Sequence, residues 1–303
     1  MDGRSPATLI VGCDGRVGGA LMTSLERSGR RVVGTTRRNV AYDESRIHLD
    51  LSEDLRNRKF PWPVSTAVIC AGVTNIAACE REPEKSARVN VAGITGLIEN
   101  LVESGAFVIY LSSNLVFDGS VSYRLPTDSP CPVTEHGRHR AKVESKISHF
   151  GESISIVRFS KVLGPIEPLF ASWTESLKKK ETIQPFSDLN MAPVPVSSAV
   201  SILRLMIEQH IPGIFHLSGA RDISYADAAR IGAAAIGADE SLITPISGTD
   251  AGLEPKQLPR YATLNIERLK LFFGIQPPDV DWTIRTAFAN PGALGAETAK
   301  HRS

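Results

Sequence analysis

The stretch that decides the fold of this chain is Leu9-Ile10-Val11-Gly12-Cys13-Asp14-Gly15-Arg16-Val17-Gly18-Gly19. An apolar strand runs into glycines at every third position, and a helix begins among them. Glycine permits a tight turn, lets backbone N–H groups approach a pyrophosphate, and allows the helix to pack close to the strand. The pattern predicts a dinucleotide-binding turn, with a purely structural turn as the alternative. The cofactor residues predicted here are Gly12, Asp14, Gly15, Arg16, Val17 and Gly18.

The rest of the first half alternates short β-branched segments with helical patterns. This alternation specifies a parallel sheet covered by helices, and right-handed crossovers leave a doubly wound α/β sheet as the fold. The expected strands are Thr8–Val11, Arg31–Thr35, Thr66–Cys70, Phe107–Leu111 and Ser155–Phe159, and the expected helices are Arg16–Ser28, Lys85–Ser104 and Arg138–Phe150.

Proline becomes frequent after Gly164, which predicts a domain boundary. We expect a dinucleotide-binding domain over residues 1–164 and a smaller substrate-binding lobe over 165–290, some of whose segments return to the sheet. Helices are expected at Ser197–Gln209 and Tyr225–Ile236, and a short strand at Gly213–Leu217. Residues 291–303 are expected to form a flexible tail.

Composition narrows the function classes. The 303 residues include 34 Lys+Arg and 33 Asp+Glu, and a net charge of +1 gives no field that would attract nucleic acid or an anionic membrane. No apolar run approaches the roughly 20 residues that a membrane helix needs. The four cysteines form no metal or disulfide pattern, so we expect no metal and a cytoplasmic location.

The end of the second strand bears on cofactor choice. An acid there accepts hydrogen bonds from the ribose of NAD, whereas a cation takes the extra phosphate of NADP. Here Thr36, Arg37 and Arg38 follow without an acid and favour NADP over NAD, unless the arginines are only a solvated loop. Asp50 and Leu51, after a third short strand, are expected near the adenine, although an exposed loop aspartate is an equal alternative. Asp14 costs free energy beside a pyrophosphate unless it points away.

A family resemblance covers almost the whole chain, to about Trp282. The motifs Val68-Ile69-Cys70-Ala71-Gly72-Val73-Thr74, Val89-Asn90-Val91, Leu111-Ser112-Ser113-Asn114-Leu115-Val116-Phe117-Asp118-Gly119 and Gly213-Ile214-Phe215-His216-Leu217-Ser218-Gly219 carry it. Their order resembles the extended short-chain dehydrogenase/reductase superfamily, and within it the dTDP-4-dehydrorhamnose reductase branch. The resemblance implies NAD(P)H-dependent reduction of a 4-keto group on a nucleotide-linked sugar. It also implies roles in cofactor binding for Ala71, Gly72, Val73, Asn90 and Ser112, and in substrate binding for Thr74, Asn114 and Arg260; for Arg260 a surface arginine is an equal alternative.

In such reductases a Ser or Thr polarises the carbonyl, a Tyr delivers the proton, and a Lys lowers the pKa of that Tyr and holds the ribose. The hydroxyl carries over to Ser113. The segment His136-Gly137-Arg138-His139-Arg140 places His136 at the tyrosine position and Arg140 at the lysine position. Both are predicted as catalytic residues, and Arg140 also as a ribose ligand.

The histidine can be interpreted in two ways. Imidazole has a pKa of about 6.5 and can donate a proton without help, but Arg140 on the same helical face disfavours imidazolium. The chain is therefore either a reductase with an atypical acid/base site or a catalytically silent binding or regulatory subunit, similar to the β-subunit of methionine adenosyltransferase. Two copies could pair through Lys85–Ser104 and the helix that carries His136. His139 and His149 are expected to face solvent.

Overall fold

The computed structural model describes residues 5–38 and 45–295. The chain divides into two compact units. The first unit comprises Met1–Phe117, Ser129–Arg158 and Ile202–Phe215; the second comprises Asp118–Asp128, Phe159–Ser201 and His216–Ser303. Each unit is therefore assembled from segments that are far apart in the sequence.

A seven-stranded sheet forms the centre of the first unit. Its strands are β1 (Ala7–Val11), β2 (Val32–Thr36), β3 (Arg46–His48), β4 (Val64–Ile69), β5 (Phe107–Ser113), β6 (Ile154–Phe159) and β10 (Gly213–Leu217), in the order β10-β6-β5-β4-β1-β2-β3. β1 pairs in parallel with β2 and β4, β2 with β3, and β4 with β5. This is the predicted doubly wound α/β fold. The predicted strand at 213–217 forms the edge of this sheet, next to β6.

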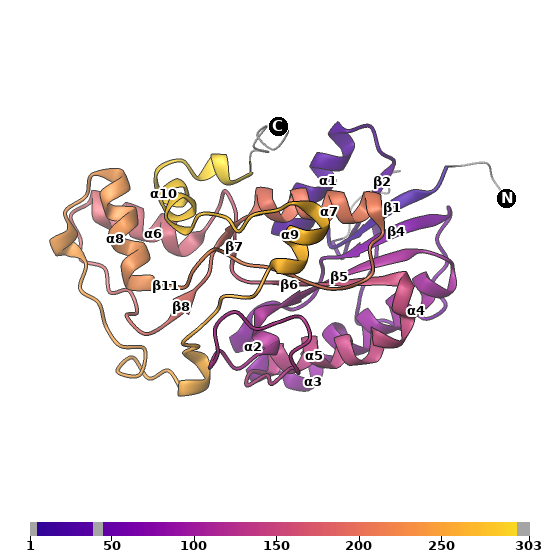
Figure 1. Cartoon of the computed structure of the whole chain (residues 1–303), viewed down its shortest axis with the longest axis horizontal. Helices are drawn as coiled ribbons and strands as arrows, with labels where there is room; N and C mark the ends of the chain where they lie inside the picture. Colours follow the sequence, from indigo (N-terminus) through magenta and orange to yellow (C-terminus); the bar gives the residue numbers. More distant parts are fainter. Residues whose placement is uncertain (1–4, 39–44, 296–303) are drawn as a thin grey trace. The chain divides into compact units, whose positions relative to one another are not determined.

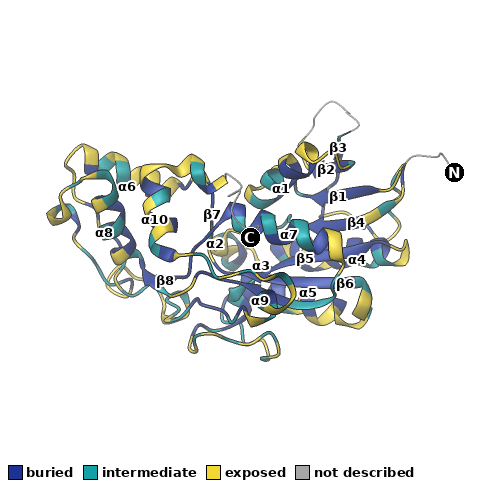
Figure 2. Ribbon diagram, turned by 45° about the horizontal axis from the view of Figure 1, so that its top comes forward, coloured by how far each residue is buried: buried dark blue, intermediate teal, exposed yellow. Residues whose placement is uncertain are grey.

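Helices cover both faces of the sheet. α1 (Arg16–Arg27) and α7 (Val196–Gln209) lie on one face, and α4 (Ile94–Glu103) and α5 (Glu135–Ile147) lie on the other (Figure 1). Because β1 is covered on both sides, all five of its residues are buried, which explains its continuous apolar sequence (Figure 2). The predicted helix at 85–104 is divided into α3 (Pro83–Ala87), a π-helix η1 (Arg88–Gly93) and α4.

The second unit is built around an aromatic cluster. Phe170 of α6 (Pro168–Lys178) stacks on Trp173, with ring centroids 5.6 Å apart, and on Phe288 of α10 (Val280–Ala289), at 5.0 Å. Beyond the two helices expected after Gly164, the structure adds α6, α9 (Glu267–Phe273) and α10. The remaining elements are the helix α8 (Tyr225–Ile236) and the strands β7 (Val162–Leu163), β8 (Asn190–Met191), β9 (Val194–Pro195) and β11 (Ile223–Ser224).

The other elements are short helices, and one of them forms at 291–295, within the segment that was expected to be a flexible tail. They are α2 (Ile76–Arg81) and the 3₁₀ turns η2 (Asn114–Val116), η3 (Ser148–Ser153), η4 (Glu240–Leu242), η5 (Pro255–Gln257) and η6 (Pro291–Gly295). Leu294 in η6 is fully buried in the aromatic cluster, so this residue fastens the first part of the expected tail to the second unit. Residues 296–303 lie outside the described residues. Among the helices of the described ranges, none is long and apolar enough to cross a membrane.

Candidate active site

The glycine-rich turn between β1 and α1 has no room for side chains at two of its glycines. Gly12 has a φ of +89°, and a Cβ there would lie 2.8 Å from Cβ of Ala71. A Cβ at Gly18 would lie 2.3 Å from the carbonyl oxygen of Gly12. These contacts explain the spacing of the glycines, because the turn must pass close to the end of β4 while α1 packs against it.

The N-terminus of α1 suits an anion. Gly15 is the N-cap and has no side chain that could accept from the first backbone N–H groups, and the first turn of the helix contains no acidic residue. Such N–H groups and the helix dipole stabilise phosphate oxygens. The residues present therefore fit the pyrophosphate of a dinucleotide, as the sequence pattern predicts.

Asp14 points from this turn toward the end of β2. Its Oδ2 accepts a hydrogen bond from the hydroxyl of Thr36 and lies 3.8 Å from Nε of Arg38. The turn is tied to the same strand by the backbone N–H of Gly12, which donates to Oγ1 of Thr35 at 3.1 Å. The carboxylate is thus directed to the strand end where an acid was missing from the sequence.

The segment after β4 is held by a buried asparagine. Asn90, fully buried in the π-helix η1, accepts from the backbone N–H of Val73 at 2.7 Å and donates to its carbonyl at 2.9 Å. Gly72 has a φ of +147°, and a Cβ there would lie 2.9 Å from Oδ1 of Asn90 and 3.3 Å from Nη2 of Arg140. Both amide atoms of Asn90 serve to shape this segment. π-helical turns of this kind are frequent at functional sites.

Arg140 lies in the middle of the site. Its Nη1 donates to the hydroxyl of Tyr110 at 3.1 Å and to the carbonyl of Leu111 at 3.0 Å, both in β5. Only 6% of the residue is exposed, and its Nε has no hydrogen-bond partner among the described residues. Arg140 therefore joins α5 to β5 and to the Gly72 segment, with donor capacity left over.

His136 is buried one turn before Arg140, with 5% of the residue exposed. Burial, followed by the charge of Arg140, lowers its pKa to about 3, while a hydrogen bond with the Val73 backbone acts in the opposite direction. Its Nδ1 has no hydrogen-bond partner in the part of the chain that the structure describes. The ring is consequently neutral at physiological pH. His139, expected to face solvent, is also buried, whereas His149 is exposed as predicted.

A close backbone approach places α5 beside the end of β5. A Cβ at Gly137 would lie 2.0 Å from the carbonyl oxygen of Leu115 in η2. Ser113 is the N-cap of η2: its Oγ accepts from the backbone N–H of Leu115 at 3.1 Å and donates to Oδ1 of Asn114 at 3.3 Å. Since Gly137 follows His136, this packing brings the histidine to the strand end that carries the serine.

Ser112 takes part in a buried ion-pair network. Its hydroxyl donates to Oε1 of Glu144 at 2.5 Å. Glu144 accepts from Arg158 of β6 through Nε and Nη2, the latter at 2.6 Å, and both charged side chains are almost fully buried. The network fastens α5 to β5 and β6 and so fixes the helix that carries His136 and Arg140.

The remaining predicted residues are spread around these. Thr74 is exposed, Asp50 is partly exposed and accepts from the backbone N–H of Ser52 at 2.8 Å, and the side chain of Leu51 is buried in the core. Arg260 belongs to the second unit, where it is exposed and its guanidinium lies 5.2 Å from the ring centroid of Tyr261. The backbone N–H of Tyr261 donates to Gly119 at 2.9 Å, in the segment that connects η2 to α5.

Sequence reasoning missed Tyr110 and Arg158. Both lie inside apolar strand patterns, Tyr110 in Phe107–Leu111 and Arg158 in Ser155–Phe159. An arginine within a buried strand signals a buried carboxylate partner, and this signal could have identified Glu144.

Comparison with known proteins agrees with this architecture. The RmlD substrate binding domain family matches residues 7–290. The chain belongs to this family. The predicted resemblance to dTDP-4-dehydrorhamnose reductases is thereby confirmed, although the two substitutions at His136 and Arg140 stay a prediction.

The relatives of this chain include a probable reductase and the β-subunit of an adenosyltransferase. A probable low-salt glycan biosynthesis reductase, Agl14, of Haloferax volcanii is 24% identical over 90% of this chain and 94% of the relative. The β-subunit of methionine adenosyltransferase 2 of Rattus norvegicus is 26% identical over 88% of this chain and 82% of the relative. The fold matches a dTDP-4-dehydrorhamnose reductase of Bacillus anthracis, solved in complex with NADP, with a TM-score of 0.79, at 18% identity and over 95% and 99% of the two chains.

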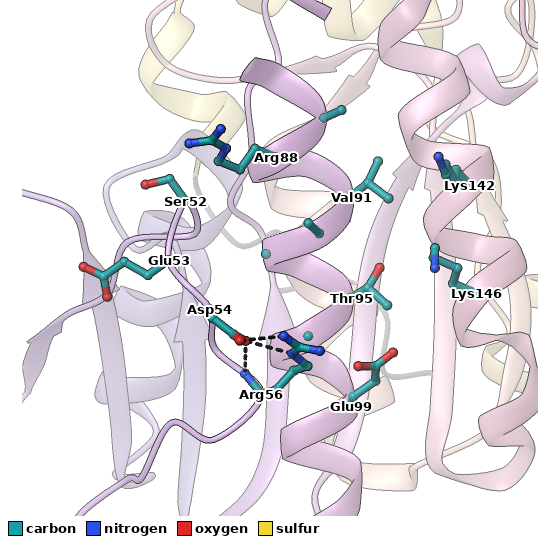
Figure 3. Close-up of a pocket in the computed structure, with 14 residues that line it drawn as sticks. Ser52, Glu53, Asp54, Arg56, Arg88, Val91, Thr95, Glu99, Lys142 and Lys146 are labelled. Carbon is teal, nitrogen blue, oxygen red and sulfur yellow. Dashed lines mark hydrogen bonds and ion pairs between the residues drawn. The ribbon is translucent and has the colours of Figure 1, made fainter. Parts of the chain in front are cut away.

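A pocket of about 770 Å³ in this RmlD-family chain lies away from these residues (Figure 3). It is a groove between the segment 52–56, η1 with the start of α4, and Lys142 and Lys146 of α5. Gly93 and Gly96 allow the segment to pack closely, since a Cβ at Gly93 would lie 1.8 Å from the carbonyl of Leu51. No group of three or more His, Cys, Asp or Glu residues suited to a metal occurs within 5–38 and 45–295.

Proposed function

We propose that the chain is an NADP(H)-binding reductase of a nucleotide-linked 4-ketosugar with an altered acid/base site. The observation that supports it best is the anchoring of Arg140. Its guanidinium is held by Tyr110 and Leu111 while Nη2 is directed to Gly72. Arg140 of α5 thus contacts β5 and the segment that follows β4. These contacts lie at the carboxyl edge of the sheet, where α/β folds bind their ligands.

The dinucleotide would lie along this edge. The glycine turn and α1 suit the pyrophosphate. Thr36 is the last residue of β2, and Arg37 and Arg38 follow it where the adenosine ribose would bind. Two arginines favour the 2′-phosphate of NADP over the bare ribose of NAD. Arg140 offers its remaining donors to the nicotinamide ribose. NADPH, when bound, supplies the hydride that adds to the carbonyl carbon of the sugar.

The carbonyl oxygen gains a negative charge and then a proton. Ser113 lies at the end of β5 and donates a hydrogen bond to the oxygen in this proposal, releasing Asn114. His136 is neutral because burial and Arg140 hold its pKa at about 3, so its ring carries a single N–H, which in the structure is hydrogen-bonded to the Val73 backbone. In this proposal that N–H leaves the Val73 backbone when substrate binds and donates to the carbonyl oxygen instead. Neutral imidazole is known to polarise a carbonyl in this way. The proton that completes the alcohol passes from this ring, which regains one from solvent.

The test is NADPH oxidation with a panel of nucleotide-linked 4-ketosugars. We would compare the wild type with His136→Tyr and with the double variant His136→Tyr, Arg140→Lys. Turnover by the wild type on any sugar supports the reductase. Arg140→Lys removes donors from Tyr110 and Leu111. The single variant His136→Tyr keeps Arg140, so it separates the change of proton donor from the loss of this anchoring.

The buried, neutral His136 favours a second function. With no strong acid at this position, the chain could bind both ligands without reacting them, as a regulatory subunit of another enzyme. The similarity to the methionine adenosyltransferase β-subunit supports this alternative. Tight NADPH binding by the wild type, together with turnover only in His136→Tyr, would favour a silent binding role, and co-purification of a stoichiometric enzyme partner would favour a regulatory subunit.

Assembly and location complete the proposal. We expect two copies to pair through α4 and α5, the helices that border the groove of Figure 3. Sedimentation of the wild type and of Lys142→Glu, Lys146→Glu tests this, and the double variant should be monomeric. We place the protein in the cytoplasm because none of its four cysteines, all of which the structure describes, forms a disulfide.

A further inference from the structure

The end of β2 receives its acid from another part of the chain. In dinucleotide-binding folds, an acid after this strand accepts hydrogen bonds from the adenosine ribose, whereas a cation there takes the 2′-phosphate. The sequence shows only Thr36, Arg37 and Arg38 at this point. In the structure, however, the carboxylate of Asp14 reaches the same strand end from the glycine turn, 22 residues earlier than Thr36.

The carboxylate is held firmly while its cationic neighbour is not. Thr36 is 3% exposed and donates its hydroxyl to Oδ2 of Asp14. The backbone N–H of Arg38 donates to Oγ1 of Thr36 at 3.0 Å, which fixes the threonine in turn. The side chain of Arg38 is 76% exposed and lies 3.8 Å from Asp14. An exposed pair at this distance is weak, so Arg38 can turn toward a ligand while Asp14 stays in place.

We infer that Asp14 is a specificity-determining residue that moderates the choice between NADP(H) and NAD(H). Its carboxylate accepts hydrogen bonds from ribose hydroxyls and repels a 2′-phosphate, and Arg38 offsets this repulsion by binding the phosphate. The wild type therefore prefers NADP(H) less strongly than Arg37 and Arg38 alone would make it. This inference rests on the proposed cofactor site but not on the reductase chemistry.

Removal of one charge at Asp14 should separate the two cofactors. Asn in place of Asp14 keeps an oxygen that accepts from Thr36, so the turn retains its geometry. We expect Asp14→Asn to bind NADP⁺ more tightly and NAD⁺ less tightly, and to shift the ratio of the two Kd values by about tenfold toward NADP⁺. The same shift is expected for 2′,5′-ADP relative to 5′-AMP, which contain only the adenosine half of the cofactors.

The experiment is isothermal titration of the full-length chain with these four ligands. The matched control is Asp54→Asn, because Asp54 is also an exposed aspartate of the first unit paired with an arginine, Arg56, at 2.6 Å. The control should leave both ratios as in the wild type. A ratio in Asp14→Asn within twofold of the wild type, or shifted toward NAD⁺, would overturn the inference.

The outcomes also separate this inference from the proposed function. Binding of the dinucleotides with the expected shift, but without turnover on any ketosugar, supports the role of Asp14 and counts against the reductase. Failure of the wild type to bind any of the four ligands would remove both, because the cofactor site itself would be absent.

Discussion

The guanidinium of Arg140 donates a 3.1 Å hydrogen bond to the hydroxyl of Tyr110, a residue with no exposed surface. The same Nη1 also binds the carbonyl of Leu111. A charged side chain inside a fold is costly unless it is hydrogen-bonded, and Tyr110 supplies one of the two acceptors that bind Nη1. Tyr110 therefore positions Arg140, the residue that we propose donates hydrogen bonds to the nicotinamide ribose.

Tyr110→Phe should weaken both the fold and the cofactor site. Loss of a hydrogen bond to a buried charged group costs about 1–3 kcal/mol of unfolding free energy. Because Arg140 then has one anchor fewer, the Kd for NADPH should also rise, which a purely structural role would not cause. Urea unfolding and titration with NADPH measure the two effects. Tyr123→Phe is the control, since Tyr123 is exposed and its hydroxyl donates to Ala220; equal Kd values for both variants would count against positioning by Tyr110.

Glu144→Gln should be strongly destabilising. Arg158 is 1% exposed and Glu144 binds it in a bidentate way, so the variant removes the negative charge that faces this buried guanidinium. Breaking a buried ion pair costs about 3–5 kcal/mol. Glu175→Gln removes an exposed pair with Lys179 and should change the stability little, because water and salt screen such a pair. Chemical denaturation of Glu144→Gln and Glu175→Gln measures the difference. Similar midpoints would show that the buried pair contributes no more to stability than the exposed one.

Gly137→Ala should disturb the approach of α5 to η2. An added Cβ would lie 2.0 Å from the carbonyl of Leu115, so the helix or the turn must move. Overpacking of this kind costs about 1–3 kcal/mol, although alanine alone favours a helix by about 1 kcal/mol. Lys142→Ala, at an exposed position of the same helix, is the control. If the Tm of Gly137→Ala in a thermal melt equalled or exceeded that of the wild type, the close contact between α5 and η2 would be refuted.

Much of the fold was predictable because its signals are local. Burial on both faces makes β1 continuously apolar, and the glycine spacing marks the turn that follows it. The edge position of β10 was not predictable in the same way, because its neighbour β6 lies some 50 residues earlier and no short pattern encodes that pairing. The π-helix inside 85–104 was hidden for a related reason: Asn90 turns toward Val73, a contact across 17 residues.

In the candidate site, too, local sequence signals were readable and contacts between distant residues were not. The family resemblance pointed to Ser113, His136 and Arg140, which lie on elements that pack together. The direction of the Asp14 side chain depends on Thr36, a contact across 22 residues, and could not be read from the turn. His139 was expected to be exposed from its polar surroundings in the helix, but tertiary packing buries it.

The last prediction concerns the stability of the fold in acid. His136 has a pKa of about 3 in the folded chain, against 6.5 for an unperturbed histidine. Between these values the unfolded chain binds a proton at this residue that the folded chain does not, so stability is complete above about pH 6.5 and falls as the pH is lowered toward 3. At pH 5 the loss from this residue should be about 2 kcal/mol.

The variant His136→Gln tests this prediction because glutamine does not titrate. Urea unfolding at pH 5 and pH 8 should show a smaller loss of stability in the variant than in the wild type, by about 2 kcal/mol. His139 and His210, whose pKa values burial also lowers, keep their share of the acid sensitivity in both proteins, so the difference isolates His136. The exposed His149 gives the matched control, and His149→Gln should follow the wild type. If the curves of His136→Gln and the wild type ran parallel, the histidine would titrate alike in both states and could serve as an imidazolium donor after all.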